Sequence, residues 1–131
     1  MPITYSIDRA QQRLFAVAVG VVTYSEIVAH LEKERDDSGL PFPELIEATG
    51  AKVALDAAEV RQVVERLRDL GYHNALGPTA VVTVDDFSYG IMRMLETLVE
   101  DVCDVRPFRS RSDAEEWLDT IPTRRPPTQE R

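Results

Sequence analysis

Cysteine, histidine and long apolar runs are all scarce in this 131-residue chain. The single cysteine, Cys103, excludes an intrachain disulfide and an all-cysteine metal site, and it favours a reducing compartment. The longest apolar run, Leu14 to Val22, is under half of the ~20 residues that a membrane-spanning helix requires. No basic and apolar leader opens the sequence, so we expect a cytoplasmic protein without membrane insertion.

Positive charge is also in short supply, with 15 basic against 23 acidic side chains and a net charge of −8. Such an acidic surface repels nucleic acids, so we expect no nucleic-acid partner. We assign residues 1–119 to a single domain of ordinary size. Residues 120–131 contain three prolines and no apolar period, which predicts a disordered tail.

The signatures of common enzyme classes are missing. The only imidazoles are His30 and His73, which we interpret as surface residues on separate elements, without partners at metal-binding spacing. The sequence contains no glycine-rich phosphate loop, nucleophile elbow or Cys-His pairing. We therefore expect no catalytic residues, no metal site and no cofactor.

Apolar periodicity divides the chain into strand-like and helix-like segments. Five segments are predicted as strands: Ile3 to Ile7, Leu14 to Val22, Glu44 to Gly50, Pro78 to Val84 and Val105 to Phe108. Amphipathic patterns predict helices from Thr23, from Asp56 and from Asp85 to Val102, followed by a short helix that carries Trp117 and Leu118.

Four of these strand-like segments are followed by a helix-start signal, in which a capping residue precedes an acidic residue by three positions. The signals are Thr23-Tyr-Ser-Glu26, Asp56-Ala-Ala-Glu59, Thr83-Val-Asp-Asp86 and Ser112-Asp-Ala-Glu115. The element order is therefore β-β-α-β-α-β-α-β-α. Strands joined through a helix pair in parallel, so we predict an α/β fold with a five-stranded mixed sheet and helices largely on one face.

The chain also resembles a known family. The resemblance rests on Leu45-Ile-Glu-Ala-Thr-Gly50, Ala80-Val-Val-Thr-Val84, Tyr89-Gly-Ile-Met-Arg-Met94 and the ending Val105 to Leu118, which contains Phe-Arg and Ala-Glu-Glu-Trp-Leu. These segments are similar to the SpoIIAA-like, STAS-type family, in particular to an uncharacterised bacterial branch also compared with CRAL-TRIO lipid-transfer domains. The resemblance implies a STAS-like fold and a function in binding a partner or a small ligand.

One departure from that family affects the expected regulation. In STAS anti-sigma antagonists the second helix begins with Asp-Ser-Ser, whose serine is phosphorylated to release a partner. Here the corresponding residues are Asp56, Ala57 and Ala58, so this switch is absent. Thr49 is the nearest earlier hydroxyl and is a possible regulatory site, and Glu47 represents the carboxylate that the family often carries at the end of the third strand.

The third helix carries the candidate binding residues. A glycine inside a helix costs about 1 kcal/mol relative to alanine, so Gly90 needs an explanation, and we favour tight packing over contact with a ligand. Tyr89, Gly90 and Arg93 would form the mouth of a pocket, in which Arg93 binds a carboxylate or phosphate. Alternatively, Arg93 only pairs with Glu96, Glu100 or Asp86.

Three larger side chains have alternative interpretations. Met92 and Met94 either fill the core or line a soft apolar pocket. Trp117 either covers the core or forms an interface contact.

From these residues we predict a non-catalytic binding or regulatory module that acts through its third helix and the neighbouring sheet edge. The partner would be a protein. As an alternative, the protein carries a small apolar or amphipathic ligand in a pocket lined by Phe87, Met92, Met94 and Trp117. A second alternative is an enzyme assembled at the interface of a homodimer, with His73 or Arg93 meeting across the symmetry axis.

Overall fold

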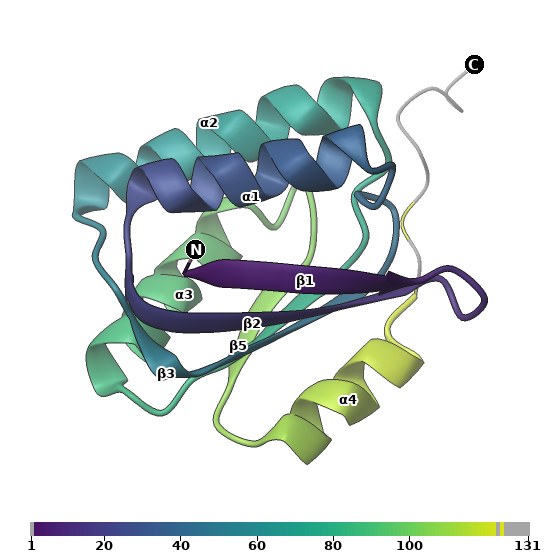
Figure 1. Ribbon diagram of the computed structural model, residues 1–131. Helices are drawn as coiled ribbons and strands as arrows, with labels where there is room; N and C mark the ends of the chain where they lie inside the picture. Colours follow the sequence, from purple (N-terminus) through teal and green to yellow (C-terminus); the bar gives the residue numbers. More distant parts are fainter. Residues whose placement is uncertain (1, 123, 125–131) are drawn as a thin grey trace.

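The computed structural model describes residues 2–122 and 124. Along the chain the elements are β1 (Ile3–Asp8), β2 (Arg13–Val22), α1 (Tyr24–Asp36), β3 (Glu44–Val53), α2 (Ala57–His73), β4 (Thr79–Val82), α3 (Asp86–Leu98), β5 (Val105–Phe108) and α4 (Arg111–Thr120). Figure 1 shows this arrangement. The predicted element order is confirmed.

The sheet contains five strands in the order β1-β2-β3-β4-β5. The hairpin strands β1 and β2 are antiparallel, and each later strand is parallel to the one before it. This is the mixed sheet expected from one hairpin followed by helical crossovers. The pairing of β2 with β3 shifts register between Val17 and Val19, where β3 contains one extra residue.

Helices cover both faces of the sheet, but unequally. Helices α1, α2 and α3 share the larger core with one face, whereas Ala114 and Leu118 of α4 pack with Leu45, Ala80 and Val82 on the other. In Figure 1, α1 and α2 lie on one side of the sheet and α4 lies on the opposite side. The prediction that the helices lie largely on one face is therefore confirmed, with α4 as the exception.

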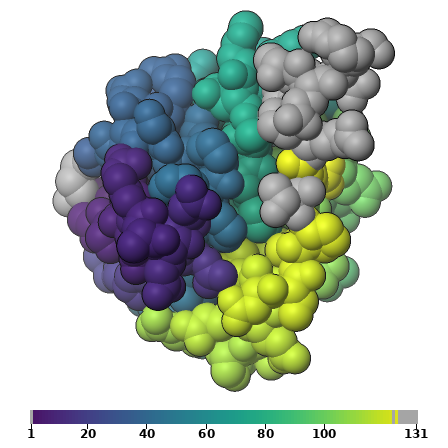
Figure 2. Space-filling model, turned by 90° about the vertical axis from the view of Figure 1, so that its right-hand side faces the viewer, coloured from purple at the N-terminus to yellow at the C-terminus, as the bar shows by residue number. Residues whose placement is uncertain are grey.

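The apolar pattern of the strands explains these two layers. Successive side chains of a strand point to opposite faces, so a strand buried on both faces is apolar throughout. In β4, Val81 faces the three-helix layer, while Ala80 and Val82 face α4. On the α4 side, Arg13 at the start of β2 forms an ion pair of 3.0 Å with Asp119. Figure 2 shows the N-terminal hairpin (purple) and α4 (yellow) next to each other on the side of the molecule turned to the viewer.

Two of the four predicted helix-start signals are correct. Asp56 caps α2 by accepting from the Glu59 N–H at 2.8 Å, and Glu26 accepts from the Thr23 N–H at the same distance. In the other two signals the predicted capping residue lies two positions from the actual cap, although the predicted start of the third helix at Asp85 is correct. Asp85 rather than Thr83 caps α3, and Ser110 rather than Ser112 caps α4. In both cases a second good capping residue lies nearby, and tertiary packing decides between the two.

Some element ends also differ from the prediction. Strand β3 continues to Val53 because β2 remains paired with it as far as Val22. Helix α3 ends at Leu98, where Val99 is the C-cap and its carbonyl accepts from the N–H groups of Val102 and Cys103. No helix among the described residues is long and apolar enough to cross a membrane.

The predicted tail falls largely outside the described part of the chain. Thr120 belongs to α4, and the Arg124 guanidinium contacts both carboxylate oxygens of Asp104 at 2.9 and 3.0 Å. Residues 123 and 125–131 lie outside the described residues, so disorder there stays a prediction.

Candidate functional site

Helix α3 presents an exposed apolar stripe. Phe87 is 61% exposed, Met94 37% and Leu98 39%. These residues are seven and four positions apart, which places them along one side of a helix, and Gly90 lies between the first two. We call Phe87, Gly90, Met94 and Leu98 the α3 stripe. The same helix buries Ser88, Ile91, Met92 and Leu95 in the core.

Gly90 has no close packing partner among the described residues. A methyl group added at this position would meet no atom within 4 Å other than its immediate neighbours and the backbone of its own helix. The expectation that Gly90 permits tight intramolecular packing is therefore wrong. Contacts within the described chain do not account for the cost of a glycine inside a helix.

Charged and aromatic side chains surround the α3 stripe. Arg93 pairs with Glu96 at 3.3 Å, as one of the alternatives predicted, and Glu96 also pairs with Arg106 at 2.9 Å. The guanidinium of Arg109 lies 4.2 Å from the centre of the Tyr89 ring. Tyr89 and Arg93 are thus engaged with neighbouring side chains on the surface of the molecule.

The four residues predicted to line a carrier pocket do not meet. Met92 is buried in the three-helix core, whereas Phe87 and Met94 are exposed. Trp117 packs against Phe108 in the layer formed with α4, with 5.5 Å between the ring centres. Trp117 therefore covers core on the far side of the sheet from Met92. Thr49 is exposed, beside the register shift in β3.

A different cavity exists between the sheet and the three-helix layer. It has a volume of about 120 Å³ and is almost entirely apolar, with Val22, Val63, Val81, Met92 and Leu95 among its lining residues. His30 and Glu44 supply polar side chains to its wall. Met92 lines this cavity, whereas Phe87, Met94 and Trp117, which were predicted to line a pocket with it, do not.

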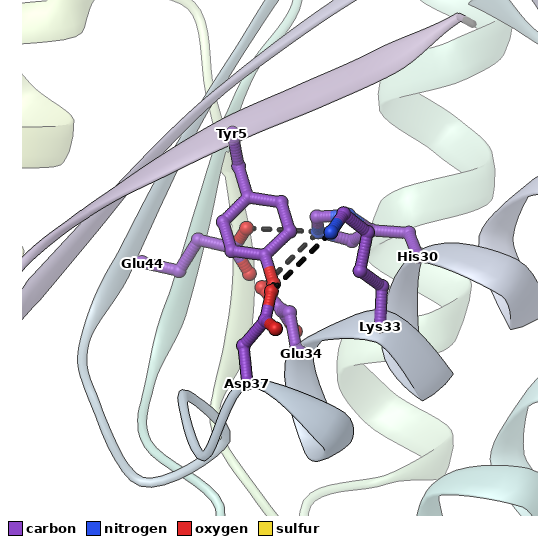
Figure 3. Close-up of polar contacts among 6 residues, drawn as sticks. All are labelled: Tyr5, His30, Lys33, Glu34, Asp37 and Glu44. Carbon is purple, nitrogen blue, oxygen red and sulfur yellow. Dashed lines mark hydrogen bonds and ion pairs between the residues drawn. The ribbon is translucent and has the colours of Figure 1, made fainter.

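The most unusual side chains of the core are His30, Glu34 and Glu44, which we call the buried triad. Their exposed fractions are only 8, 3 and 4%. The His30 Nε2 atom lies 2.9 Å from Glu44 Oε2 and 3.1 Å from Glu34 Oε2 (Figure 3). Our interpretation of His30 as a surface residue without a carboxylate partner was therefore wrong. His73, at the end of α2, is exposed as expected.

Part of this triad could have been found in the sequence. His30 and Glu34 are four residues apart in α1, so their side chains lie on the same face of the helix. Glu44 is the first residue of β3, and only the packing of α1 on the sheet brings it to the same place. No local pattern signals that third residue.

Other polar groups surround the triad. The Tyr5 ring lies edge-on to His30 with 5.2 Å between ring centres, and its hydroxyl donates to Asp37 (Figure 3). Lys33 contacts the same Asp37 carboxylate at 3.4 Å. The hydrogen bond from Tyr5 is the main reason that the pKa of Asp37 is lowered. Burial, followed by the bond to Asp37, raises the pKa of Tyr5.

The pKa values of His30 and Glu34 are both raised, for different reasons. Burial lowers the pKa of His30, but the contacts with Glu34 and Glu44 outweigh burial and raise it overall. Burial raises the pKa of Glu34, against the opposing contact with His30. The triad therefore holds ionisable groups that the protein has removed from water.

Comparison with known proteins identifies the fold. No protein-family model matches the chain, and no curated protein matches it significantly. Among solved structures, it is similar to an uncharacterized protein of the DUF3478 family with a SpoIIAA-like fold, from Shewanella loihica PV-4. That similarity has a TM-score of 0.56 and 21% sequence identity, and it covers 88% of this chain and 93% of the other. The chain thus has a SpoIIAA-like fold.

Proposed function

We propose that this protein is a non-catalytic binding module that docks a segment of a partner protein on the α3 stripe. The observation that carries the proposal is the exposure of Phe87, Met94 and Leu98 beside a glycine with open space above it. Single exposed apolar residues are ordinary on protein surfaces. An aligned series on one helix, with a costly glycine inside it, is what a docking surface requires.

The shape of the stripe favours a protein segment over a small molecule. It spans twelve residues, from position 87 to 98, which corresponds to roughly 16 Å along the helix. A convex helix face of this length suits another helix or an extended segment, and Gly90 allows the partner to approach closely. Arg93, Glu96 and Arg109 provide a polar rim around the apolar centre. A patch of this size suits a transient regulatory contact.

Regulation by phosphorylation would need a hydroxyl other than the one that the STAS antagonists use. Ala57 and Ala58 follow the cap residue Asp56 and have none. Thr49 remains our candidate because its side chain is exposed. Phosphate at that position would add roughly two negative charges to the surface.

Site-specific photo-cross-linking tests the docking surface. A photoreactive phenylalanine analogue placed at position 90 or 94 should cross-link one and the same partner in the native host. The same analogue at Glu65, which is exposed on α2, is the matched control. The partner is then purified, and its affinity is measured for the unmodified protein and for the Phe87→Ser variant.

The cross-linking result distinguishes a partner protein, a second copy of this chain and no docking at all. A shared partner at positions 90 and 94, with at least about tenfold weaker binding to Phe87→Ser, supports the proposal. A product of twice the chain mass would identify a second copy of this chain as the occupant. If both positions label no more than the Glu65 control, the α3 stripe is not a docking surface.

The core cavity favours a second candidate function, the carriage of a small apolar ligand. Its volume of about 120 Å³ is close to the ~150 Å³ of an engineered cavity that binds benzene. A ligand of about that size fits, whereas a long-chain lipid does not unless the helices separate. Native mass spectrometry of freshly purified protein should show a small added mass, and a chain of bare mass would count against carriage.

A further inference from the structure

The buried triad joins residues from two elements around one point. His30 and Glu34 come from α1, and Glu44 comes from the start of β3. We propose that His30 Nε2 and one carboxylate oxygen each from Glu34 and Glu44 bind a divalent transition-metal ion. All three potential ligand atoms lie within 4.8 Å of one another.

The separations between the ligand atoms fit adjacent positions around a metal. The imidazole nitrogen lies 2.9 and 3.1 Å from the two carboxylate oxygens. With metal–ligand bonds of about 2.1 Å, two ligands at a right angle are about 3.0 Å apart, and two at the tetrahedral angle about 3.4 Å. The two nitrogen–oxygen distances therefore match adjacent corners of an octahedron.

Hydrogen bonding alone does not satisfy this arrangement. One imidazole nitrogen carries at most one proton, yet two carboxylate oxygens converge on it. The bond to Glu44 uses that proton, and Glu34 Oε2 is left buried without a hydrogen-bond partner among the described residues. Glu34 is only 3% exposed, so water does not readily replace the missing partner. A metal ion would coordinate both oxygens and the nitrogen at once.

Charge balance points in the same direction. When the imidazole is neutral, as a metal ligand must be, the two carboxylates leave a charge of −2, which a divalent cation neutralises inside the core. Without the ion, His30, whose pKa is raised, is the positive group of the triad. The other cationic groups on the same helix point elsewhere: Lys33 reaches outward to Asp37 with a side chain that is 63% exposed, and Arg35 pairs with Asp36. Tyr5 and Asp37 are hydrogen-bonded to each other beside the triad, and the Tyr5 ring packs edge-on against His30.

The surrounding space can complete the coordination. A void of about 30 Å³ is lined by Glu34 and Glu44, which is about the volume of one water molecule in the liquid. The larger apolar cavity adjoins His30 and Glu44. Because one imidazole and two carboxylates are borderline to hard ligands, the ions that fit are Mn²⁺, Fe²⁺, Co²⁺ and Zn²⁺. This site does not involve the α3 stripe, so the metal-binding test and the docking test have independent outcomes.

Metal titration of the chelator-treated full-length protein tests the proposal. Titration calorimetry with Co²⁺ and Mn²⁺ should give one ion per chain, and bound Co²⁺ should show the weak visible bands of a six-coordinate ion. Removing even a group that only supports a ligand commonly weakens metal binding 10–100-fold. Glu34→Gln and Glu44→Gln should therefore each weaken binding by at least about 100-fold. Glu65→Gln, at an exposed acid on α2, should leave the affinity unchanged.

Stability measurements keep the test decisive if a variant folds poorly. Both Gln variants preserve side-chain shape, and circular dichroism checks their folding before titration. Metal should raise the Tm of the unmodified protein and of Glu65→Gln, but not that of Glu34→Gln. The proposal is overturned if the unmodified protein binds no ion, or if both Gln variants bind as tightly as it does.

Discussion

Helices α1 and α3 depart from ordinary amphipathic design in opposite ways. The fully buried side chains of α1 are His30 and Glu34, both polar. Helix α3 buries Ile91, Met92 and Leu95 but also leaves Phe87 and Leu98 exposed. In a typical surface helix, charged groups face water and apolar groups face the core.

Helix α2 shows that this chain can follow the ordinary pattern. Its buried residues are all apolar: Val60, Val63, Val64, Leu67 and Leu70. The departures in α1 and α3 are therefore local. Buried charge requires desolvation, and an exposed apolar stripe promotes association. Each departure has a cost that folding alone does not explain, which is why we place the two candidate sites there.

The largest expected effect comes from removing the cation of the buried triad. His30→Ala should lower the free energy of unfolding by about 3–5 kcal/mol in chelator-treated protein, because it leaves two buried carboxylates without their positive partner. Urea denaturation measures the change. His73→Ala, at an exposed position, should stay within about 0.5 kcal/mol. Equal effects at both positions would show that the triad adds nothing to stability.

Two methionines in α3 give the next contrast. Met92→Ala should lower the free energy of unfolding by about 2–5 kcal/mol, since Met92 is 8% exposed and its loss enlarges the core cavity. Met94→Ala should change it by no more than about 0.5 kcal/mol, because Met94 belongs to the exposed stripe. Thermal or urea unfolding of both variants checks this. A similar loss in both would contradict the assignment of opposite faces.

The fold could be predicted because its determinants are local. A near-continuous apolar run such as Leu14 to Val22 indicates a strand, although Val17, Val19 and Val21 on one face of β2 are exposed. A helix between two strands requires parallel pairing. Helix starts were harder to predict. Asp85 and Ser110 each compete with a second capping residue two positions away, and local pattern does not choose between them.

The candidate sites could be predicted only in part. The sequence shows that Gly90 lies inside a helix, but whether it faces the core or open space depends on how α3 packs. The spacing of His30 and Glu34 was visible, yet their burial follows from the position of α1 over the sheet. Glu44 joins them through a contact between separate elements, which periodicity does not encode.

Gly90 allows a test that should increase stability. Gly90→Ala should raise the free energy of unfolding by about 0.5–1 kcal/mol, because alanine favours the helix and the added methyl meets open space. Gly77→Ala is the opposite control, since its added methyl would lie 2.5 Å from the Pro41 carbonyl oxygen and should destabilise the fold. Chemical denaturation distinguishes them. A destabilised Gly90→Ala would mean that this position is packed within the chain after all.

The smallest expected change in stability belongs to Phe87. Phe87→Ser should leave the free energy of unfolding within about 0.5 kcal/mol, because the side chain is 61% exposed at the first turn of α3. The same variant should lose cross-linking from position 94, because an aromatic anchor contributes to docking out of proportion to its effect on folding. Stability is measured by urea unfolding and docking by cross-linking yield. A large loss of stability would show that Phe87 stabilises the fold and is not simply an exposed docking residue. Only α1, with its buried triad, would then depart from the ordinary amphipathic pattern.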